Sequence, residues 1–310
     1  MKFKPLVPKK LKTYSLKGRA SKVNVRDFAG LPAPGDSVHE FLSNLPNILA
    51  AKDLKDVAAA VVTAHKNGRT VALGIGAHVI KVGLAPLIID LIKRGIVSSV
   101  AMNGACVVHD FETAYAGATS EDVDSELGSG AFGMAEETGT ILNRAIKKGA
   151  KKGLGRAVGE MINNSRFPYK DKSVLAACAK YDVPATVHVA IGTDILHVHP
   201  QMDGAATGLA TQADFRLFSG VVSKLSGGVY LNVGSAVILP EVFLKALTLG
   251  RNMGHRIDNF STVNMDFIQH YRPLTNVVRR PTAGSGKGYR LTGHHEIMFP
   301  LLYAAIMEGL

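Results

Sequence analysis

The sequence predicts an α/β protein with a Rossmann-like parallel sheet and helices on both faces. Apolar runs rich in β-branched residues, most of them ending in Gly or Asn, alternate with segments that have a helical periodicity of apolar residues. The apolar runs contain few polar positions, as expected of parallel strands that are covered on both faces. With 310 residues, of which 46% are hydrophobic, the chain is long enough to bury one large core.

The expected strands and helices follow one another as in repeated βαβ units. The strands are expected at residues 69–76, 97–105, 183–194, 228–236 and 255–264. The segments with helical periodicity are residues 54–68, 84–95, 173–182 and 239–254. Neither an internal repeat nor a Ser- or Gly-rich linker divides the chain. We therefore expect a single domain over residues 31–310, preceded by a basic arm at residues 1–30.

Turns beyond the carboxyl ends of the strands are the candidate ligand sites of such a sheet. These turns are residues 74–78, 103–110, 192–194, 234–235 and 262–266. A strand-to-helix turn needs glycine and a capping side chain with or without a ligand, so no single turn is diagnostic. The turn GIGAHV lacks the third glycine of the dinucleotide fingerprint. The stretch AGSGKG fails the spacing of a phosphate loop, because Pro281 stands five residues before Gly286.

The net charge of +11 is concentrated at the N-terminus. Nine Lys and Arg residues, from Lys2 to Arg26, precede the first acidic residue, Asp27, which leaves about +2 for the rest of the chain. Phe3 and Tyr14 are the only rings between Lys2 and Arg26, so stacking on nucleic-acid bases is not favoured. We expect a solvated or subunit-wrapping arm and no specific nucleic-acid partner.

The sequence carries no sign of a membrane segment or of disulfides. No apolar run reaches the roughly 20 residues of a membrane helix, and the basic N-terminus lacks the apolar segment of a signal peptide. We therefore expect a cytoplasmic protein with no membrane partner. Cys106 and Cys178 match no zinc spacing and are expected to be buried thiols in a reducing compartment.

Two groups of histidines are candidate metal ligands. His197 and His199 lie two residues apart and would point to one side of a strand, while His294 and His295 adjoin Glu296. Adjacent histidines cannot share one strand face, and the sequence contains no HExxH pair, so we assign no metal. A metal-dependent hydrolase is kept as an alternative interpretation of these residues.

Five segments, in this order, resemble the deoxyhypusine synthase family over about residues 70–308. They are residues 69–112, 128–139, 181–199, 224–264 and 289–306. The resemblance implies a Rossmann-like fold that binds NAD and a homotetramer with active sites between paired subunits. Enzymes of this family oxidise spermidine, pass its aminobutyl group through an imine on an enzyme lysine, and deliver it to a lysine of a translation factor.

The resemblance also implies a set of NAD-binding residues in the strand-end turns. Carried over residue by residue, they are Gly76, Ala77, His78, Met102, Asn103, Gly104, Asp110, Thr193, Asp194, Gly234, Ser235, Gly293 and His294. Asp110 is the carboxylate nearest to the family's ribose-binding acid, and Thr193 or Asp194 stands where the family has an Asp. Gly234 and Ser235 correspond to the family's glycine turn beside the nicotinamide.

This chain departs from the family in the segment that should hold the nucleophilic lysine. The family's lysine follows a Trp-Gly pair in an acidic stretch, whereas this chain has no tryptophan and its residues 264–290 are basic. Asp266 is the only carboxylate there, while Arg272, Arg279 and Arg280 would repel a polyamine if they pointed inward. Ordinary deoxyhypusine synthesis is therefore not expected, and the arginines would suit a carboxylate or phosphate.

Two lysines and one aspartate are the candidate catalytic residues. Lys287 lies in the family's lysine-bearing region, where flanking glycines would let a loop bring it to the nicotinamide. Lys81 follows His78 by three residues, so both would share one face of a helical turn close to the strand ends. A lysine becomes a nucleophile when burial or neighbouring cations lower its pKa. We prefer Lys287 for covalent chemistry and Lys81 for an anionic group, and Asp266 completes the set.

The function expected from the sequence is that of an NAD-dependent enzyme similar to deoxyhypusine synthase. It would be a transferase of an alkylamine group, or it would oxidise or reduce a polyamine-related amine. The substrate is expected to be a small amine or an anionic molecule, and the assembly a homotetramer with its sites at subunit interfaces. A noncatalytic NAD-binding sensor would explain the missing lysine motif and is kept as a second alternative.

Overall fold

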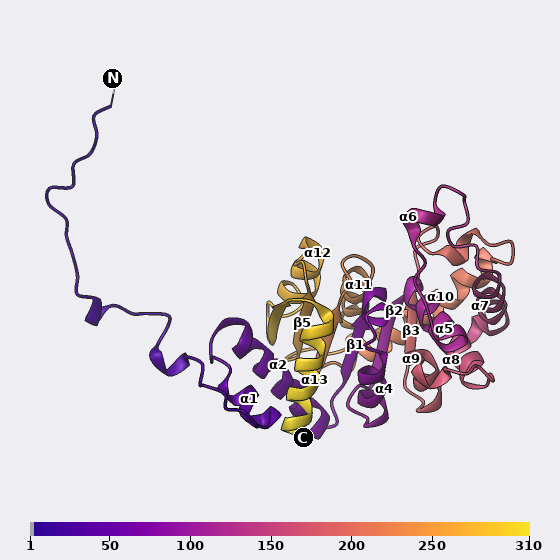
Figure 1. The fold of residues 1–310 in the computed structure, drawn as a ribbon, viewed down its shortest axis with the longest axis horizontal. Helices are drawn as coiled ribbons and strands as arrows, with labels where there is room; N and C mark the ends of the chain where they lie inside the picture. Colours follow the sequence, from indigo (N-terminus) through magenta and orange to yellow (C-terminus); the bar gives the residue numbers. More distant parts are fainter. Residues whose placement is uncertain (1–2) are drawn as a thin grey trace.

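The computed structural model describes residues 3–310, and its centre is a sheet of six parallel strands in the order β3-β2-β1-β4-β5-β6 (Figure 1). The strands are β1 (Val71–Ile75), β2 (Ser99–Asn103), β3 (Ala185–His188), β4 (Val229–Val233), β5 (Ser261–Asp266) and β6 (Lys287–Thr292). This architecture confirms the predicted α/β fold. The strand order reverses at β1, whose neighbours are β2 and β4, so the switch point of the sheet lies between β1 and β4.

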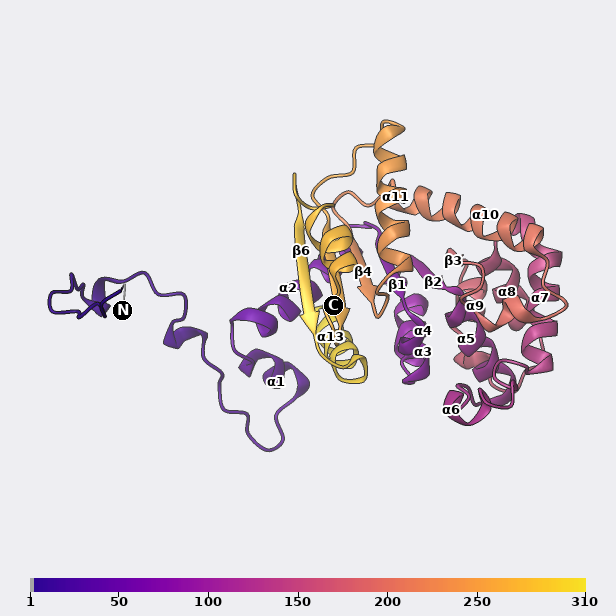
Figure 2. The same cartoon turned by 90° about the horizontal axis from the view of Figure 1, so that it is seen from above.

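Helices cover both faces of the sheet (Figure 2). They are α1 (Val38–Asn44), α2 (Leu49–Lys66), α3 (Ala77–Lys81), α4 (Ala85–Lys93), α5 (Gly104–Ala116), α6 (Val123–Glu126), α7 (Glu136–Gly149), α8 (Leu154–Asn163), α9 (Val174–Lys180), α10 (Gly204–Val222), α11 (Ile238–Asn252), α12 (Tyr271–Pro273) and α13 (His295–Gly309). Side chains of α2, α4, α5 and α13 pack on one face with Leu73 and Val263, and α11 packs on the other face with Ala72 and Tyr230.

Shorter helical turns complete the body. The 3₁₀ turns are η1 (Leu16–Gly18), η2 (Val25–Asp27), η3 (Ala150–Lys152), η4 (Lys170–Lys172) and η5 (Ile195–Val198), and the π-helix η6 is Leu274–Arg279. Within residues 3–310, none of the helices is long and apolar enough to cross a bilayer. Cys106 and Cys178 are free and buried, as the sequence predicts, and burial raises the pKa of both thiols.

The sixth strand, β6, is an addition to the five strands that the sequence predicts. It is an edge strand that pairs only with β5. Tyr289 and Leu291 are buried, whereas Lys287, Arg290 and Thr292 are exposed, so the apolar pattern is limited to two positions. The glycine-rich stretch before β6 also makes the strand difficult to predict, because glycines indicate a loop.

The N-terminal segment extends away from the body (Figures 1 and 2). From Phe3 to Gly35 every residue except Asp27 is exposed. The segment meets the body near its end, where the amide of Gly30 donates to the carbonyl of Asn44 at 2.9 Å. The basic residues of this segment are therefore not part of a folded face of this chain.

Asp214 on α10 is a fully buried carboxyl group that holds two other elements in place. Its Oδ2 accepts hydrogen bonds from the amide of Gly155 in α8 at 2.9 Å and from the amide of Val187 in β3 at 2.8 Å. Its Oδ1 has no partner among the described residues. Burial raises the pKa of Asp214 to about 7, so the folded protein favours the protonated acid.

The raised pKa of Asp214 predicts that the free energy of unfolding falls as the pH rises from about 4 to about 7. In that window the folded state holds a proton that the unfolded chain has already lost, so the stabilisation is complete below the ordinary value of 3.8 and is lost as the pH passes 7. Asp214→Asn, which mimics the neutral acid, should remove this part of the slope, worth a few kcal/mol at most. Urea unfolding across this pH range measures it.

The same substitution at Asp258 is the control for this prediction. Asp258 is partly exposed and pairs with Arg256 in the loop before β5, so Asp258→Asn should leave the pH profile nearly unchanged. An Asp214→Asn profile that is identical to that of the original protein would contradict the assignment.

Candidate functional site

The carboxyl ends of β1 and β4 meet at the switch point through two glycines. A Cβ atom on Gly76 would lie 1.9 Å from the carbonyl oxygen of Gly234, so this approach requires glycine. Gly234 has a φ of 69°, in the left-handed region that favours glycine. The amide of Gly76 donates to Val233 at 2.9 Å, which ties the end of β1 to the end of β4. Because neither glycine has a side chain, the carboxyl edge at this point is lined by side chains from the ends of the neighbouring strands.

Four rings and one carboxylate gather beside this glycine pair. We call them the ring cluster, which consists of His78, Asp266, Phe267, His294 and His295. The ring centroids of His78 and His295 are 5.6 Å apart, and Phe267 meets His295 edge-on at 5.9 Å. Phe267 also stacks on His294 at 6.2 Å. The cluster joins the ends of β1, β5 and β6, and its members His78, Phe267 and His294 are exposed.

His295, the first residue of α13, is the fully buried ring of the cluster. Neither ring nitrogen has a hydrogen-bond partner among residues 3–310. Nε2 lies 3.8 Å from Oδ1 of Asp266, and an added Cβ on Gly234 would lie 3.0 Å from Nε2. Burial lowers the pKa of His295, which favours the neutral imidazole. Buried polar groups are rarely left unpaired in structural roles, so His295 marks the candidate reaction centre.

Three side-chain amides, two of them buried, form a hydrogen-bonded ladder next to the ring cluster. Nδ2 of Asn232 donates to Oδ1 of Asn264 at 2.7 Å, and Nδ2 of Asn264 donates to Oε1 of Gln269 at 2.8 Å. Nε2 of Gln269 then donates to the carbonyl of Leu291 at 3.0 Å. The ladder connects β4, β5 and β6 to the loop that carries Phe267. It therefore sets the position of the exposed ring, and nothing in the spacing of these amides along the sequence indicates that they meet.

A second polar site lies in a cavity of about 170 Å³ beside the start of α5, which we call the acidic cavity. Its polar lining consists of His109, Glu112, Ser120, Glu121, Thr193 and Asp194. Oδ2 of Asp194 is buried without a hydrogen-bond partner among the described residues, although Nε2 of His197 lies 4.0 Å from it, and a Cβ on Gly104 would lie 2.0 Å from it. Burial raises the pKa of Asp194. Burial, together with the charge of Lys81, lowers the pKa of His109 to about 4.

The structure brings most of the predicted NAD-binding residues to the carboxyl edge of the sheet, in two groups. The group at the switch point is Gly76, Ala77, His78, Gly234, Ser235, Gly293 and His294. The group at the acidic cavity is Asn103, Gly104, Thr193 and Asp194. Met102 is fully buried in the core, so its side chain does not face the edge. β3 ends at His188, so Thr193 and Asp194 belong to the loop after it.

Asp110 does not join either group, which corrects the expectation that it could contact a ribose. Its carboxylate is fully buried and accepts hydrogen bonds from Oγ of Ser173 at 2.5 Å and from the amides of Val174 and Leu175 at 2.7 and 3.1 Å. It therefore caps the start of α9, and burial raises its pKa to about 6. The residues of α5 that line the acidic cavity have the helical spacing i, i+3, i+4, i+7 and are Ala105, Val108, His109 and Glu112.

Lys287 lies at the opposite edge of the sheet from the ring cluster. It is the first residue of β6 and pairs in register with Ser261, the first residue of β5. Its Nζ lies 2.8 Å from Oδ2 of Asp56 and 4.6 Å from the ring centroid of Tyr289. The expectation that a glycine loop brings Lys287 to the carboxyl edge does not match the structure, because this residue is held at the amino end of a strand.

Lys81 keeps the position expected from the sequence, at the carboxyl edge. It is the exposed last residue of α3, and its charge contributes to the lowered pKa of His109. The helix α3 packs against α5, which lines the acidic cavity, and Lys81 itself is not among the residues of the cavity lining. Asp266, the third candidate catalytic residue, belongs to the ring cluster.

The histidine pairs do not form a metal site within this chain. Residues 195–198 form η5 instead of a strand, so His197 and His199 point to different partners. Nδ1 of His197 accepts from the amide of Gly192 at 3.0 Å, and Nε2 of His199 lies 3.0 Å from the carbonyl oxygen of Gly133. Among residues 3–310, no three His, Cys, Asp or Glu side chains are arranged to hold a metal ion.

The three arginines of the basic segment are engaged away from the ring cluster. Their partners lie in α11 and the π-helix η6, and the pairs are Arg272 with Glu241, Arg279 with Thr275 and Arg280 with Asn276. The predicted repulsion of an amine by inward-pointing arginines therefore does not apply at the ring cluster.

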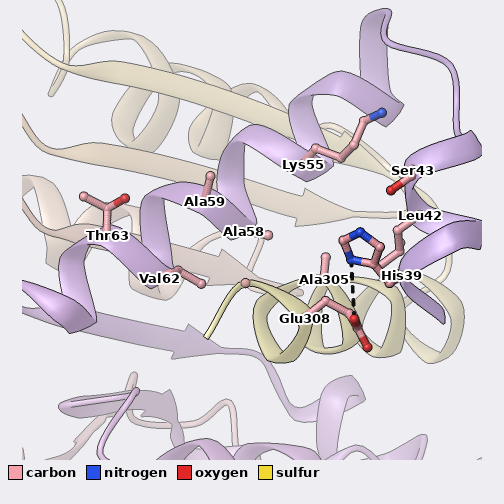
Figure 3. A pocket seen from close by; sticks show the side chains of 11 residues that line it. His39, Leu42, Ser43, Lys55, Ala58, Ala59, Val62, Thr63, Ala305 and Glu308 are labelled. Atoms are coloured by element: carbon pink, nitrogen blue, oxygen red, sulfur yellow. Dashed lines mark ion pairs between the residues drawn. The ribbon is translucent and has the colours of Figure 1, made fainter. Parts of the chain in front are cut away.

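Another cavity, of about 320 Å³, lies among α1, α2 and α13 (Figure 3). Its lining is mostly small and apolar, and its ion pair joins Nδ1 of His39 to Oε2 of Glu308 at 3.6 Å. Glu308 is near the end of α13, whereas His295 begins that helix, so this cavity is separate from the ring cluster. Within residues 3–310 it has no buried side-chain polar atom that lacks a hydrogen-bond partner, so it is not the candidate site.

No protein-family model matches this chain, and no curated protein matches it in sequence. Solved structures with the same fold include ArgZ, an arginine dihydrolase of Cyanobacteria (17% identity, TM-score 0.54, 84% of this chain and 33% of that chain). They also include AgrE in a ternary complex with ornithine and NAD+ (15%, 0.54, 84% and 34%). A third is a candidate deoxyhypusine synthase from Entamoeba histolytica (14%, 0.50, 88% and 94%). This chain spans about a third of the length of ArgZ and AgrE.

Proposed function

We propose that this chain is an NAD-dependent enzyme that oxidises or reduces the C–N bond of an amine at the ring cluster. The observation that carries the proposal is the meeting of the buried Asp266 and the unpartnered His295 with the exposed ring of Phe267 at the switch point. Open α/β sheets bind dinucleotides at this place. The complex of AgrE with ornithine and NAD+, which matches the fold of this chain, supports the choice of an amine and a dinucleotide.

The residues at the carboxyl edge suit NAD. Gly76 and Gly234 leave the switch point free of side chains. The helices that follow the strands begin at this edge, and the backbone amides of a helix N-terminus favour binding of a pyrophosphate. The acidic cavity offers Oδ2 of Asp194 as an acceptor for a ribose hydroxyl group. When bound, NAD supplies a nicotinamide ring that accepts or returns a hydride.

The ring cluster contains groups that could bind an amine and accept a proton from it. Asp266 would pair with the ammonium group, and the exposed face of Phe267 would attract the same positive charge. The exposed imidazole of His78 would take the proton that the nitrogen must lose before a hydride leaves the neighbouring carbon and the C=N bond forms. His295 packs edge-on against His78 and, as a neutral ring, would hold it in orientation.

No lysine belongs to the ring cluster in the described part of this chain, so the proposal does not include an imine on the enzyme. Lys287 is held at the amino edge by Asp56. Lys81 is the last residue of α3, the helix that follows β1 at the carboxyl edge, and would pair with a phosphate of NAD. Transfer of an alkylamine group through an enzyme imine would require a lysine from another copy of the chain.

Calorimetric titration with NAD+ and NADH tests the proposal, and we expect saturable binding of both. Absence of binding to the folded protein would contradict it. Formation of NADH is then followed with putrescine, spermidine and ornithine as separate probes. Tight binding of NAD with no turnover of any probe would favour the noncatalytic sensor, which the absence of a lysine in the ring cluster also favours.

A matched pair of lysine variants separates the two edges of the sheet. Lys81→Ala should weaken NAD binding by about 1–3 kcal/mol, as loss of a charged hydrogen bond does. Lys287→Ala should leave NAD binding unchanged and lower the free energy of unfolding by less than about 1 kcal/mol, because its ion pair with Asp56 is largely exposed. Calorimetry and urea unfolding measure both effects. Loss of NAD binding in Lys287→Ala would show that the amino edge takes part in the site.

A further inference from the structure

The N-terminal arm, residues 3–30, carries many charges and apolar groups without partners in its own chain. Eight of its residues, from Lys4 to Arg26, are Lys or Arg, and none forms an ion pair within the described residues. Its exposed large apolar side chains are Phe3, Leu6, Val7, Leu11, Tyr14, Leu16, Val23, Val25 and Phe28. A purely solvated linker has no need of so many apolar groups.

A second exposed segment has the complementary character. We call residues 121–137, which include α6, the acidic segment. Its carboxylates are Glu121, Asp122, Asp124, Glu126, Glu136 and Glu137, and none forms an ion pair within the described residues. No Lys or Arg occurs between residues 95 and 143, so this segment carries only negative formal charge along the sequence. Val123, Leu127 and Met134 are its exposed apolar side chains.

The arm and the acidic segment lie at opposite ends of the molecule. In Figures 1 and 2 the arm leaves the body beside α1 and runs outward, whereas α6 lies on the other side of the molecule, the side that holds β3. The arm therefore points away from the acidic segment of its own chain. A second copy of the chain would present that segment without this geometric restriction.

We propose that the arm of one copy binds the acidic segment of a second copy. Opposite charges would align the two segments, and exposed side chains such as Leu11 and Tyr14 would bury apolar surface against Val123 and Leu127. Each single ion pair at such a surface contributes little, so the contact depends on many pairs and weakens with salt. A nucleic-acid partner is less well supported, because the arm has few rings for base stacking and the acidic segment would stay uncovered.

Zero-length carbodiimide cross-linking of the full-length protein tests this contact. Equal amounts of isotopically labelled and unlabelled protein are mixed, and we expect cross-links between Lys9, Lys10 or Lys12 and the carboxylates of the acidic segment in mixed-label pairs. The ion pair of Lys147 with Asp203, at 3.1 Å, is the internal control and should give same-label cross-links only.

Charge reversal makes the test specific. The triple variants Lys9→Glu/Lys10→Glu/Lys12→Glu and Asp122→Lys/Asp124→Lys/Glu126→Lys should each lower the mixed-label cross-links about tenfold or more, because like charges then face each other. Combining the two variants should restore cross-links between the reversed segments. The Lys147 control cross-link confirms that each variant is folded.

Three results would overturn the proposal. They are cross-links between arm and acidic segment in same-label pairs alone, with no mixed-label pairs; no cross-links above those of the charge-reversal variants; and binding of the arm to nucleic acid while the acidic segment stays unmodified. None of these measurements uses NAD or an amine, so failure of this proposal is distinguishable from failure of the proposed enzyme activity.

Discussion

Replacing Asp266 by Asn should weaken binding of an amine about 10- to 150-fold, because a hydrogen bond to a charged group contributes about 1.5–3 kcal/mol. Asp266 is 4% exposed and lies 3.8 Å from the ring of His295, so its negative charge acts where water is largely excluded. Asn keeps the size of the side chain and an oxygen that can accept from the amide of Phe267, as Oδ1 of Asp266 does at 2.8 Å. The local backbone should therefore survive the substitution, and only the charge is lost.

Two measurements separate the expected result from a general loss of structure. NAD affinity by calorimetry should stay within about threefold, because Asp266 is assigned to the amine and not to the dinucleotide. Asp258→Asn, in the loop at the other end of β5, is the matched control and should change neither affinity. Undiminished amine-dependent formation of NADH by Asp266→Asn would remove this carboxylate from the substrate site.

Gly76→Ala should destabilise the protein by about 1–3 kcal/mol and abolish measurable NAD binding, as insertion of a methyl group into a packed contact does. The added Cβ would lie 1.9 Å from the carbonyl oxygen of Gly234 and 2.6 Å from its carbon, and neither backbone atom can move like a flexible side chain. Gly76 has a φ of −88°, which alanine adopts freely, so the effect is steric alone. The turns of β1 and β4 must separate to make room.

Gly208→Ala is the control for the size of the added group. Gly208 lies inside α10, and a Cβ there would meet nothing within 4 Å. This variant should be more stable by roughly 0.5–1 kcal/mol, because alanine favours a helix over glycine. Urea unfolding and NAD titration of both variants check the prediction. A Gly76→Ala protein with the original stability and NAD affinity would show that the switch point is not the dinucleotide site.

The residues brought together at the switch point were only partly predictable. Gly76 and Gly234 could be predicted because a glycine that follows an apolar, strand-like run is recognisable in the sequence. His295 appeared in the sequence only as a neighbour of His294 in a possible metal pair. Its assignment as the candidate reaction centre depends on its complete burial beside Asp266. Neither the burial nor this proximity can be inferred from the neighbouring residues in the sequence.

At the acidic cavity, too, the residue predicted from the sequence differs from the residues that the structure places at the site. The resemblance predicts Asp110 as the carboxylate of this turn, whereas the cavity is lined by His109 and Glu112. The helical spacing from Ala105 to Glu112 was available as a signal, but it does not say which face of α5 is covered. The position of α9 determines which face of α5 is covered. The amides of Val174 and Leu175, in the first turn of α9, donate hydrogen bonds to the carboxylate of Asp110.

The sequence by itself determined the α/β class and the approximate places of five strands, because strands buried on both faces must be apolar along their whole length. It also determined that Gly76, Gly234 and Asp266 end strands, since parallel strands bring their carboxyl ends to one edge. The tertiary structure decided the rest. Lys287 stands at the start of an edge strand with few buried side chains, so its location depends on pairing with β5, and pairing between segments far apart in the chain leaves no local signal.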